Sequence, residues 1–332
     1  MIPDRDLNVA VLGAWGRTRP SPGRGWEMLA ATGVRGLRLF AETGALAALL
    51  LTEIGEEAAA VLRANAARVG RPGLEVRRAD AREPPGGGPF DYVDLDPFGS
   101  PLPFLGSALD SLAPGGLLAV TATDLTVLAG AQAEACERRY GARPVRGRQG
   151  PEGGLRILLA RLARSAAARG RALRPLVAYV LDHHVRAYVT EGPPGRPPPV
   201  ALWTGPPGPG PPLAGRPPFG PLWTGPLFDP EFVAGLSVPA AAARPRELDR
   251  LLCRFREESA VAEPFYFEPN EVARSERLPR PPPLEPLLQE LRREGHRAAR
   301  SHMRPGAFRT DAPAGAVAAA ARRLAAAPAG PA

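Results

Sequence analysis

The sequence of 332 residues contains only two cysteines, Cys136 and Cys253. Two thiols can build neither a disulfide framework nor a four-thiolate zinc site, so both kinds of covalent or metal staple are excluded. We expect a reduced, cytoplasmic protein that binds no metal. The sequence also lacks a run of about 18 apolar residues and an N-terminal signal segment. We therefore expect a soluble chain without a membrane partner.

Lysine is absent, because all 42 basic residues are arginine. The formal net charge of +8 and the pI of about 10.5 favour an anionic partner such as nucleic acid, since phosphates that basic side chains neutralise release their counterions. A compositional bias that raises arginine together with the 42 prolines and 37 glycines produces the same numbers. The charge is therefore mild support for a nucleic-acid partner.

The length and the hydrophobic content of 44% predict a substantial core and two domains. Residues 191–221 are dominated by proline and glycine, a composition that favours a linker without regular elements. We expect a first domain over residues 1–190 and a second over 222–311. Residues 312–332 are rich in alanine and broken by proline, and we expect them to form a weakly ordered tail.

Strand-like and helix-like segments alternate between residues 25 and 190. This alternation predicts an α/β fold with a parallel, doubly wound, Rossmann-like sheet and a smaller α+β domain after it. Strands are expected at the start of 26–42 and at 48–54, 74–80, 90–96 and 115–124, helices at 56–70 and 154–170, and a hairpin at 174–190. In the second domain, four leucines share one face of a helix expected over 283–295.

The segment FDYVDLDPFGSP, residues 90–101, carries Asp96 at the end of a strand. Its alternation is typical of a strand entering the core, and Pro97 prevents the strand from continuing in a central ladder. Asp96 is therefore expected at the carboxyl end of the fourth strand. In open α/β sheets, ligands bind at that end.

Three earlier strand ends also carry ligand-binding signals. Glycines in the turn at 30–36 allow close backbone approach, but the turn lacks the G-x-G-x-x-G pattern, which argues against a nicotinamide cofactor. Glu53 ends the second strand about 20 residues later, where carboxylates bind ribose hydroxyls, and Asp80 ends the third. A plain tight turn and a solvated Glu53 are the alternatives. The ordered layout is typical of a methyltransferase that uses S-adenosylmethionine.

The composition of the turn after the fourth strand suits methyl transfer to an aromatic amine. The lone pair of such an amine is delocalised into its ring, so attack on a sulfonium methyl needs an acceptor that orients the N–H and takes the proton. Asp96 provides the acceptor, the Asp96–Pro97 backbone aligns the amine, and Phe98 stacks on the base. The alternative, that Asp96 caps a turn and Phe98 is core, is less consistent with the tightly flanking Pro97 and Gly99.

At this turn the chain closely resembles the tRNA guanine-26 N2-dimethyltransferases. The stretch DLDPFGSPLPFLGSALDSLAPGGLLAVTATDLTVLAG resembles their signature. The similarity continues collinearly in DRDLNVAVL at 4–12, LAATGVRGLR at 29–38, GPLWTGPL at 220–227 and REGHRAARSHMRPGAFRTDAP at 293–313. The resemblance implies a class I methyltransferase sheet, S-adenosyl-L-methionine as cofactor and tRNA as partner.

The resemblance also implies a role for each matching residue. In the cofactor site, Arg5 and Arg35 would approach S-adenosylmethionine, Glu53 would hold the ribose, and Asp80 and Ala81 would frame the adenine. Asp96, Pro97 and Phe98 would form the catalytic turn, whose base must first be flipped out of the tRNA stack. Phosphate contacts, which set affinity rather than sequence choice, are expected from four arginines of the C-terminal segment: Arg297, Arg300, Arg304 and Arg309.

The sequence departs from the family pattern in three places. Asp4 stands where asparagine is usual. Family members carry a short segment with an aromatic residue before this motif, whereas Met1 begins almost on it here, so we expect the start of the sequence to be placed too late. Many members have a four-cysteine zinc element where this chain has proline and glycine, so zinc is not expected. His184 replaces a usual aromatic residue. We interpret His183 and His184 as structural rather than ligand-binding.

The sequence therefore predicts a monomeric enzyme that methylates the exocyclic N2 of a tRNA guanine, expected at position 26, once or twice. Two alternatives stay open. One is an amino-methyltransferase that acts on DNA or protein, which dispensability of the C-terminal arginines would favour. The other is a non-catalytic tRNA-binding homologue, against which the retained Arg35, Asp80 and Asp96 argue.

Overall fold

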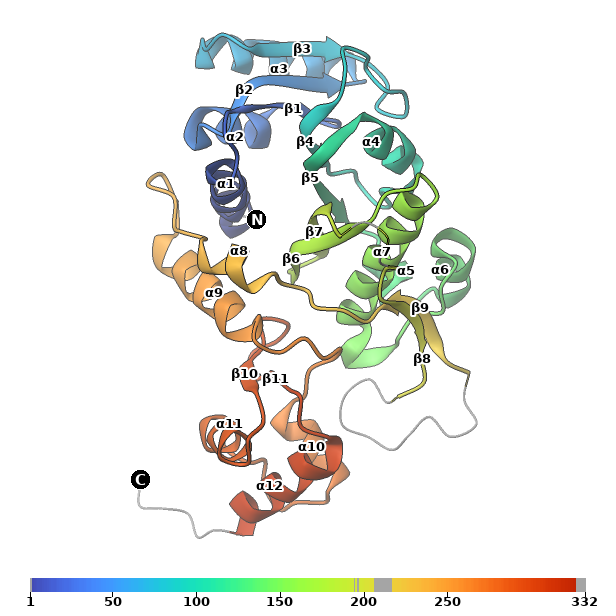
Figure 1. The fold of residues 1–332 in the computed structure, drawn as a ribbon, viewed down its shortest axis with the longest axis vertical. Helices are drawn as coiled ribbons and strands as arrows, with labels where there is room; N and C mark the ends of the chain where they lie inside the picture. Colours follow the sequence, from blue (N-terminus) through green and yellow to red (C-terminus); the bar gives the residue numbers. More distant parts are fainter. Residues whose placement is uncertain (1, 194, 196, 206–216, 327–332) are drawn as a thin grey trace.

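The computed structural model describes residues 2–193, 195, 197–205 and 217–326. Its centre is a seven-stranded sheet of order β3-β2-β1-β4-β5-β7-β6, which confirms the predicted α/β fold (Figure 1). The first five strands are parallel, and β7 and β6 form an antiparallel hairpin beside β5. The strands are β1 (Gly23–Glu27), β2 (Leu46–Glu53), β3 (Leu74–Arg78), β4 (Phe90–Leu95), β5 (Leu112–Ala122), β6 (Leu173–Leu181) and β7 (His184–Glu191).

Helices cover both faces of the sheet, as the alternation of strands and helices predicts (Figure 1). One face carries α1 (Ile2–Arg17), α2 (Val34–Thr43) and α3 (Glu56–Val69). The other carries α4 (Leu105–Ser111) and α7 (Gly150–Ala167), with the short α5 (Leu125–Leu128) and α6 (Ala133–Tyr140) beside them. Gly33, Gly44 and Gly70 flank α2 and α3 with positive φ, a conformation that suits glycine at helix ends. Two 3₁₀ turns, η1 (Leu102–Phe104) and η2 (Gly147–Gln149), complete this part of the chain.

The proline- and glycine-rich segment contains regular structure, contrary to the prediction that it has none. The strands β8 (Val200–Trp203) and β9 (Phe219–Trp223) pair antiparallel in a separate two-stranded sheet. In β9, Leu222 and Trp223 are buried against α7, so burial of large apolar side chains outweighs the local composition. Pro221 lies in a two-stranded sheet, where each strand is an edge and a missing N–H is tolerated. Residues 194, 196 and 206–216 of the predicted linker lie outside the described residues.

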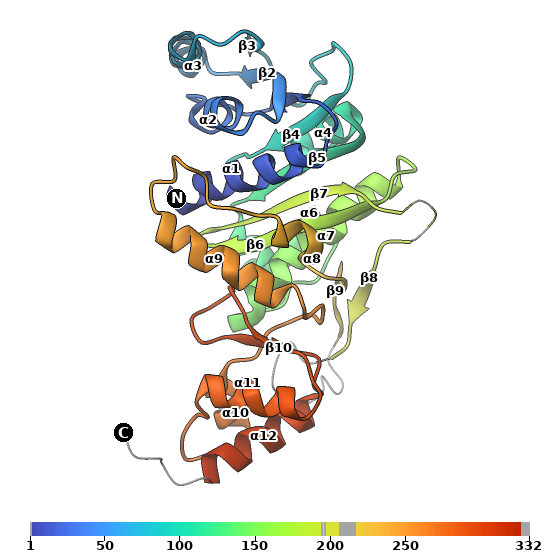
Figure 2. The same cartoon turned by 60° about the vertical axis from the view of Figure 1, so that its left-hand side comes forward.

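The elements of the C-terminal part belong to two separate apolar clusters. The helices α8 (Pro230–Ala234) and α9 (Pro245–Glu258) pack onto the main core, and both views place α9 beside α1 (Figures 1 and 2). Beyond them, α10 (Pro269–Ser275), α11 (Leu284–Arg293), α12 (Ala314–Ala326) and the short strands β10 (Ala298–Arg300) and β11 (Phe308–Thr310) form a smaller unit. This unit has its own apolar cluster, which begins at Val272 rather than near the predicted boundary.

The predicted helix of the second domain is present as α11, with Leu287, Leu288 and Leu291 buried. The prediction of a weakly ordered tail is wrong for residues 314–326, which form α12. Alanine has the highest helix propensity, and Val317, Ala320 and Ala321 present one apolar face that packs against α11. The remaining residues of the predicted tail, 327–332, lie outside the described residues. No described helix combines the length and the apolar character needed to cross a bilayer.

Candidate active site

The turn after β4 is held in place by the neighbouring strand end. The Gly99 amide donates to Thr123 Oγ1 at 2.6 Å, and the Thr123 amide donates to the Gly99 carbonyl at 3.0 Å. Gly99 has a φ of 82°, which other residues rarely adopt. These bonds fix Asp96 at the carboxyl edge of the sheet and leave the Phe98 ring fully exposed, while Pro97 is buried.

A second set of hydrogen bonds, through Ser100, stabilises the same turn. The Tyr140 hydroxyl of α6 lies 2.9 Å from the Asp124 carboxylate, to which it donates, and 2.9 Å from the Ser100 hydroxyl. Burial raises the pKa of Asp124, although the bond from Tyr140 opposes that rise. The turn is therefore tied to two elements that follow it in the chain.

Asp96 faces a cavity of about 530 Å³ at the carboxyl edge of the sheet. Strand ends β1, β2, β4 and β5, the start of β7 and the beginning of α1 and α2 contribute to its wall. The cavity brings together six of the predicted site residues: Arg5, Arg35, Glu53, Asp96, Pro97 and Phe98. Asp80 and Ala81 do not line it. Asp80 binds Arg82 in the loop after β3, and Ala81 is buried.

Arg35 lies at the centre of the acidic wall of this cavity. Its guanidinium donates to Asp96 and lies 3.8 Å from Asp94 and 3.6 Å from Asp4. Three carboxylates, from α1, from β4 and from the turn directly after β4, therefore share one cation. The sequence predicted that Arg35 approaches the cofactor, and its contact with the proposed catalytic carboxylate is an addition to that prediction.

A buried polar network underlies the cavity, and the sequence analysis missed it. Asp94 is fully buried and accepts from Arg186 at 2.7 Å and from the Tyr92 hydroxyl at 2.6 Å. Burial alone would raise the pKa of Asp94, but the guanidinium groups of Arg186 and Arg35 hold it below its usual range. Arg186 also donates to Thr121 Oγ1 at 2.6 Å. The signal in the sequence was the first aspartate of the DLD segment, two residues before Asp96.

Glu27, at the end of β1, is another cavity residue that the sequence analysis missed. Its carboxyl group is buried and accepts from the Gly36 amide at 3.1 Å. A Cβ on Gly36 would lie 2.2 Å from Glu27 Oε2, so a larger residue there would have to displace the Glu27 carboxyl group. Burial, reinforced by the charge of Asp94, raises the pKa of Glu27 to about 8. Glu27 is therefore largely protonated at neutral pH.

The turn between β1 and α2 is shaped by the end of β2. Glu53 accepts from the Ala31 amide at 2.9 Å and from the Gly55 amide at 2.8 Å. Ala31 has a φ of 47°, an uncommon conformation for a residue with a Cβ. Glu53, which lies at the end of β2, thus fixes a strained turn on the cavity wall.

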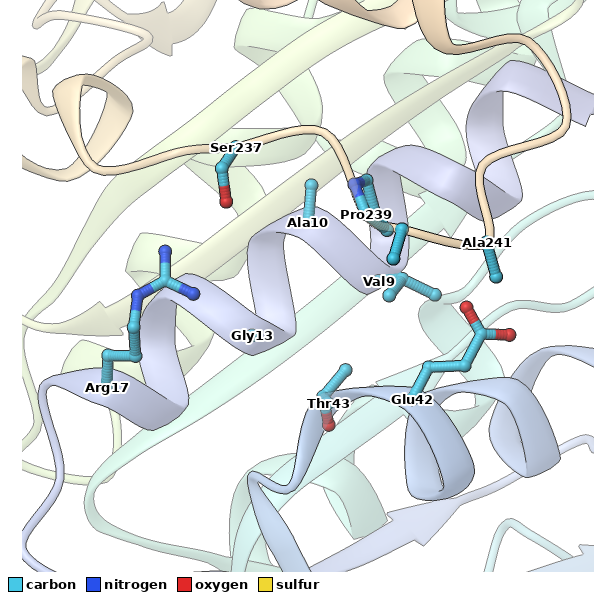
Figure 3. A pocket seen from close by; sticks show the side chains of 10 residues that line it. Val9, Ala10, Gly13, Arg17, Glu42, Thr43, Ser237, Pro239 and Ala241 are labelled. Carbon is cyan, nitrogen blue, oxygen red and sulfur yellow. The ribbon is translucent and has the colours of Figure 1, made fainter.

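A second cavity, of about 300 Å³, lies between α1, α2 and the segment 237–241 (Figure 3). Its charged lining residues are engaged elsewhere: Arg17 donates to the Gly235 carbonyl, and Glu42 binds Arg38. Apart from these two, the lining is small or apolar. This cavity therefore offers no acid or base comparable to the cluster around Asp96.

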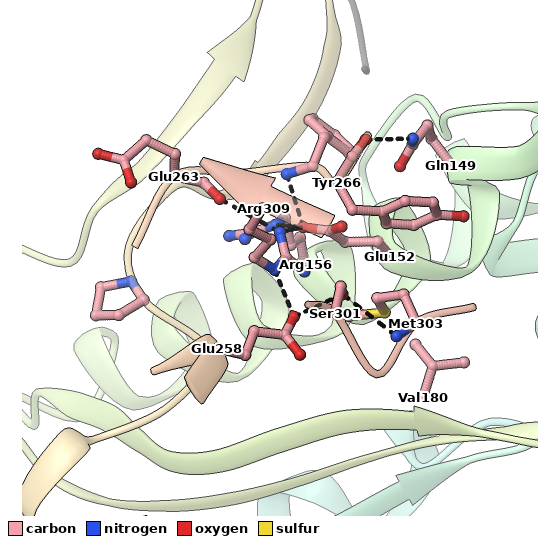
Figure 4. Close-up of polar contacts among 12 residues, drawn as sticks. Gln149, Glu152, Arg156, Val180, Glu258, Glu263, Tyr266, Ser301, Met303 and Arg309 are labelled. Carbon is pink, nitrogen blue, oxygen red and sulfur yellow. Dashed lines mark hydrogen bonds and ion pairs between the residues drawn. The ribbon is translucent and has the colours of Figure 1, made fainter. Parts of the chain in front are cut away.

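The four predicted RNA-binding arginines have different surroundings. Arg297 is 56% exposed and pairs with Asp311 at 2.8 Å, Arg300 pairs with Glu285, and Arg304 lies 3.9 Å from Glu268. The prediction for Arg309 is wrong, because its residue is 1% exposed and its guanidinium binds the buried carboxylates of Glu152 and Glu258 (Figure 4). Arg309 therefore cannot contact a phosphate in this structure.

Comparison with known proteins decides the family. Residues 1–192 and 216–322 match the family described as N2,N2-dimethylguanosine tRNA methyltransferase. This chain belongs to that family. The match includes the turn at Asp96, every residue that lines the cavity and most of the C-terminal unit. It confirms the resemblance seen in the sequence.

Individual family members show the same relationship. The chain is 37% identical over 243 residues to a tRNA (guanine(26)-N(2))-dimethyltransferase of Thermococcus kodakarensis, an alignment that covers 69% of this chain and 64% of the relative. It is 34% identical over 268 residues to the enzyme of that name from Methanospirillum hungatei, covering 68% and 66%. The chain thus spans slightly less than two thirds of these two family members.

A solved structure agrees over a larger part of the chain. Trm1 from Pyrococcus horikoshii, solved in complex with S-adenosyl-L-methionine, has a TM-score of 0.83 and 29% identity. The similarity covers 96% of this chain and 92% of that one. The family fold therefore includes the sheet and the C-terminal unit described above.

Proposed function

We propose that this chain transfers methyl groups from S-adenosyl-L-methionine to the exocyclic N2 of a guanine in tRNA, with guanine 26 as the expected target. The observation that carries the proposal is the placement of Asp96, Pro97 and Phe98 on the wall of the cavity that also holds Arg35 and Glu53. Membership of the family and the names of its related enzymes support the reaction and the substrate.

The cavity has groups that suit S-adenosylmethionine. Glu53 binds two backbone amides through its two oxygens, and its remaining lone pairs can accept from ribose hydroxyls. The contact between Gly36 and Glu27 brings the backbone of α2 close to the end of β1, as a turn that cradles a ligand requires. Several carboxylates line the cavity, which favours a positively charged sulfonium. The cofactor supplies an electrophilic methyl group on that sulfur.

Asp96 is the proton acceptor in this proposal. Its carboxylate would accept a hydrogen bond from an N2–H of the guanine and so orient the amine, while the buried Pro97 keeps the turn rigid. Bound S-adenosylmethionine would supply the methyl group and keep the electron pair of the broken S–C bond on sulfur, and Asp96 would take the proton that N2 loses. The bond from Arg35 fixes the carboxylate in position without blocking both of its oxygens.

Phe98 would hold the base against which Asp96 acts. Its ring is fully exposed at the cavity rim, although large apolar side chains are usually covered. A base flipped out of the tRNA stack could cover this face, and stacking of a base on an aromatic ring contributes about 1–3 kcal/mol. Action as a monomer in the cytoplasm is part of the same proposal, and light scattering on the purified protein tests the monomer.

The test of the proposed function is the Asp96→Asn variant. Asparagine keeps the size of the side chain but cannot take a proton, so we expect methyl transfer to fall by at least about 10²-fold, the usual lower contribution of general base catalysis. The dissociation constant of S-adenosylmethionine, measured by calorimetry, should change less than about threefold, or about 0.7 kcal/mol. Mass spectrometry of the tRNA product identifies the modified guanine and the number of methyl groups.

The matched control is Asp110→Asn, which removes a carboxylate on α4 that is exposed, bound to Arg169 and outside the cavity. It should transfer methyl groups at the wild-type rate. A large loss of cofactor affinity in Asp96→Asn would show that Asp96 serves binding rather than proton transfer. Failure of the wild-type chain to saturate with S-adenosylmethionine would instead favour the alternative of a non-catalytic RNA-binding protein.

A further inference from the structure

His184 lies on the wall of the same cavity as Asp96 and Phe98. It is the first residue of β7, and β7 runs antiparallel to β5, so its beginning lies at the carboxyl edge of the parallel strands. Its side chain is 14% exposed, whereas the neighbouring His183 lies in the turn and is exposed. The interpretation of His184 as structural does not account for this position.

The orientation of the imidazole is set by Asp4. His184 Nε2 lies 3.1 Å from Asp4 Oδ1, which also accepts from the Tyr179 hydroxyl at 2.7 Å. Burial would raise the pKa of Asp4, but the hydrogen bond with His184 and the charges of Arg186 and Arg35 hold it below its usual range. Asp4 is therefore ionised, and Nε2 must donate to it. In the neutral ring this leaves a lone pair on Nδ1, which has no hydrogen-bond partner among the described residues.

A short series of contacts connects this imidazole to the proposed catalytic carboxylate. Asp4 Oδ2 lies 3.6 Å from Arg35 Nη2, and Arg35 Nη1 donates to Asp96. The two departures from the family pattern, Asp4 and His184, thus contact each other and stand beside the acceptor site. An aspartate at position 4 provides the anion that a histidine at position 184 needs to fix its tautomer.

We propose that His184 Nδ1 accepts the N1–H of the bound guanine while Asp96 accepts an N2–H, so that His184 helps to select guanine. This inference rests on the proposed function. Guanine presents two adjacent donors, N1–H and N2–H, whereas adenine and cytosine carry an unprotonated ring nitrogen at the corresponding position. A site built to accept a hydrogen bond disfavours a base that lacks the donor, because its own polar group is left unpaired.

The test is a cycle of two proteins and two substrates. Wild type and His184→Phe are each given tRNA with guanosine or with 2-aminopurine ribonucleoside at the position that the wild type methylates. 2-Aminopurine keeps the C2 amine but has no N1–H and no O6. We expect wild type to favour guanosine by at least about tenfold in kcat/KM, and His184→Phe to reduce that preference about tenfold by slowing the guanosine reaction.

The ratio of the two rates is independent of how much of the variant is correctly folded, so a loss of stability cannot imitate the result. His183→Phe, which changes the exposed neighbour, is the matched control and should keep the wild-type ratio. An unchanged preference in His184→Phe, or an equal slowing of both substrates, overturns the inference. If the wild type methylates no tRNA guanine, the proposed function fails instead, and the two failures are thus distinguished.

Discussion

Single residues at the cavity show how this chain keeps several acids close together. Asp4, Asp94 and Asp96 all contact Arg35, and Asp94 has a second guanidinium from Arg186. Buried charges are tolerated when they are paired and hydrogen-bonded, and each of these carboxylates is. Glu27 differs from them, because no guanidinium of the described residues pairs with it and its bond comes from a backbone amide. It is therefore kept neutral rather than paired.

A pH-dependent stability follows from Glu27. Its pKa is raised from 4.5 to about 8, so its contribution to stability is fully present below pH 4.5 and is lost as the pH rises through about 8. Relative to Glu27→Gln, wild type should lose at most about 1.4 kcal/mol per pH unit in this window. Urea unfolding of both proteins at pH 5, 6.5 and 8 measures the difference, and the exposed Glu83→Gln is the control for the change in charge. A difference that does not vary with pH would contradict the assignment.

The sequence predicted some site residues and missed others for physical reasons. Asp96, Phe98 and Arg35 lie in short segments whose composition already indicates a ligand-binding turn. Glu27 was missed because the first strand was expected only at the start of residues 26–42, so this glutamate was not recognised as a strand end as Glu53 was. Arg309 was placed on the surface because a basic segment without apolar periodicity does not reveal which arginine is buried.

At the scale of elements, the strands of the main sheet follow from alternation, and the hairpin of β6 and β7 lies where the sequence predicts it. The two errors, β8–β9 and α12, have one cause. Proline and glycine dominate the first segment and alanine the second, so neither sequence pattern indicates that the segment is buried. In the structure, Trp223 of β9 is buried where β9 packs against α7, and Val317 of α12 is buried where α12 packs against α11. The sequence pattern cannot show these partner surfaces. Tertiary burial therefore decides these elements.

A buried ion-pair cluster joins the C-terminal hairpin to the main sheet domain (Figure 4). Arg309 of β11 binds Glu152 of α7 at 2.8 Å and also binds Glu258 of α9. Arg156 donates to Glu152 at 2.8 Å and, through a second nitrogen, to the Trp223 carbonyl at 2.9 Å. The pKa of Glu258 stays low against the effect of burial, because His302 and Arg309 stabilise its charged form. Three elements and the hairpin thus depend on one cluster.

Replacing Arg309 should therefore lower the free energy of unfolding more than replacing an exposed arginine does. Arg309→Met removes the buried guanidinium that Glu152 and Glu258 share and leaves them Arg156 and His302 as basic partners. We expect the free energy of unfolding to fall by about 3–5 kcal/mol. Arg297→Ala, which breaks exposed pairs in the same segment, should cost about 1 kcal/mol or less. Urea denaturation of the two variants beside wild type measures both values. Similar losses in the two variants would argue against a structural role for the cluster.

At the scale of the whole molecule, the smaller unit is attached to the sheet domain by this cluster and has its own apolar core. Figure 2 shows its helices at the end of the molecule opposite to β3. The charge of +8 predicted an anionic partner but not the surface that binds it. Many arginines already pair with carboxylates, so position rather than number decides which of them are available to RNA.

We expect the exposed pair Arg297 and Arg300 to contribute to tRNA binding. Replacing both with glutamine should weaken binding and make the slope of log affinity against log salt shallower by about 0.7–0.9 for each phosphate that the variant no longer neutralises. Their ion pairs with Asp311 and Glu285 would have to be exchanged for phosphates, which limits the effect. Filter binding at several salt concentrations measures the slope. The control replaces Arg77 and Arg78 on β3, and equal effects of the two double variants would remove the C-terminal unit from the interface.

The first helix also sets the order in which the molecule can be assembled. Asp4 and Asn8 of α1 complete their bonds with Tyr179, His184 and Tyr188, across separations of 175 to 180 residues. A chain leaving the ribosome must therefore hold its first helix without these partners until the hairpin of β6 and β7 has been synthesised. Such distant pairings fold slowly and expose apolar surface in the meantime. Translation pauses placed after that hairpin has left the ribosome would consequently favour correct folding of the nascent protein more than pauses placed before it.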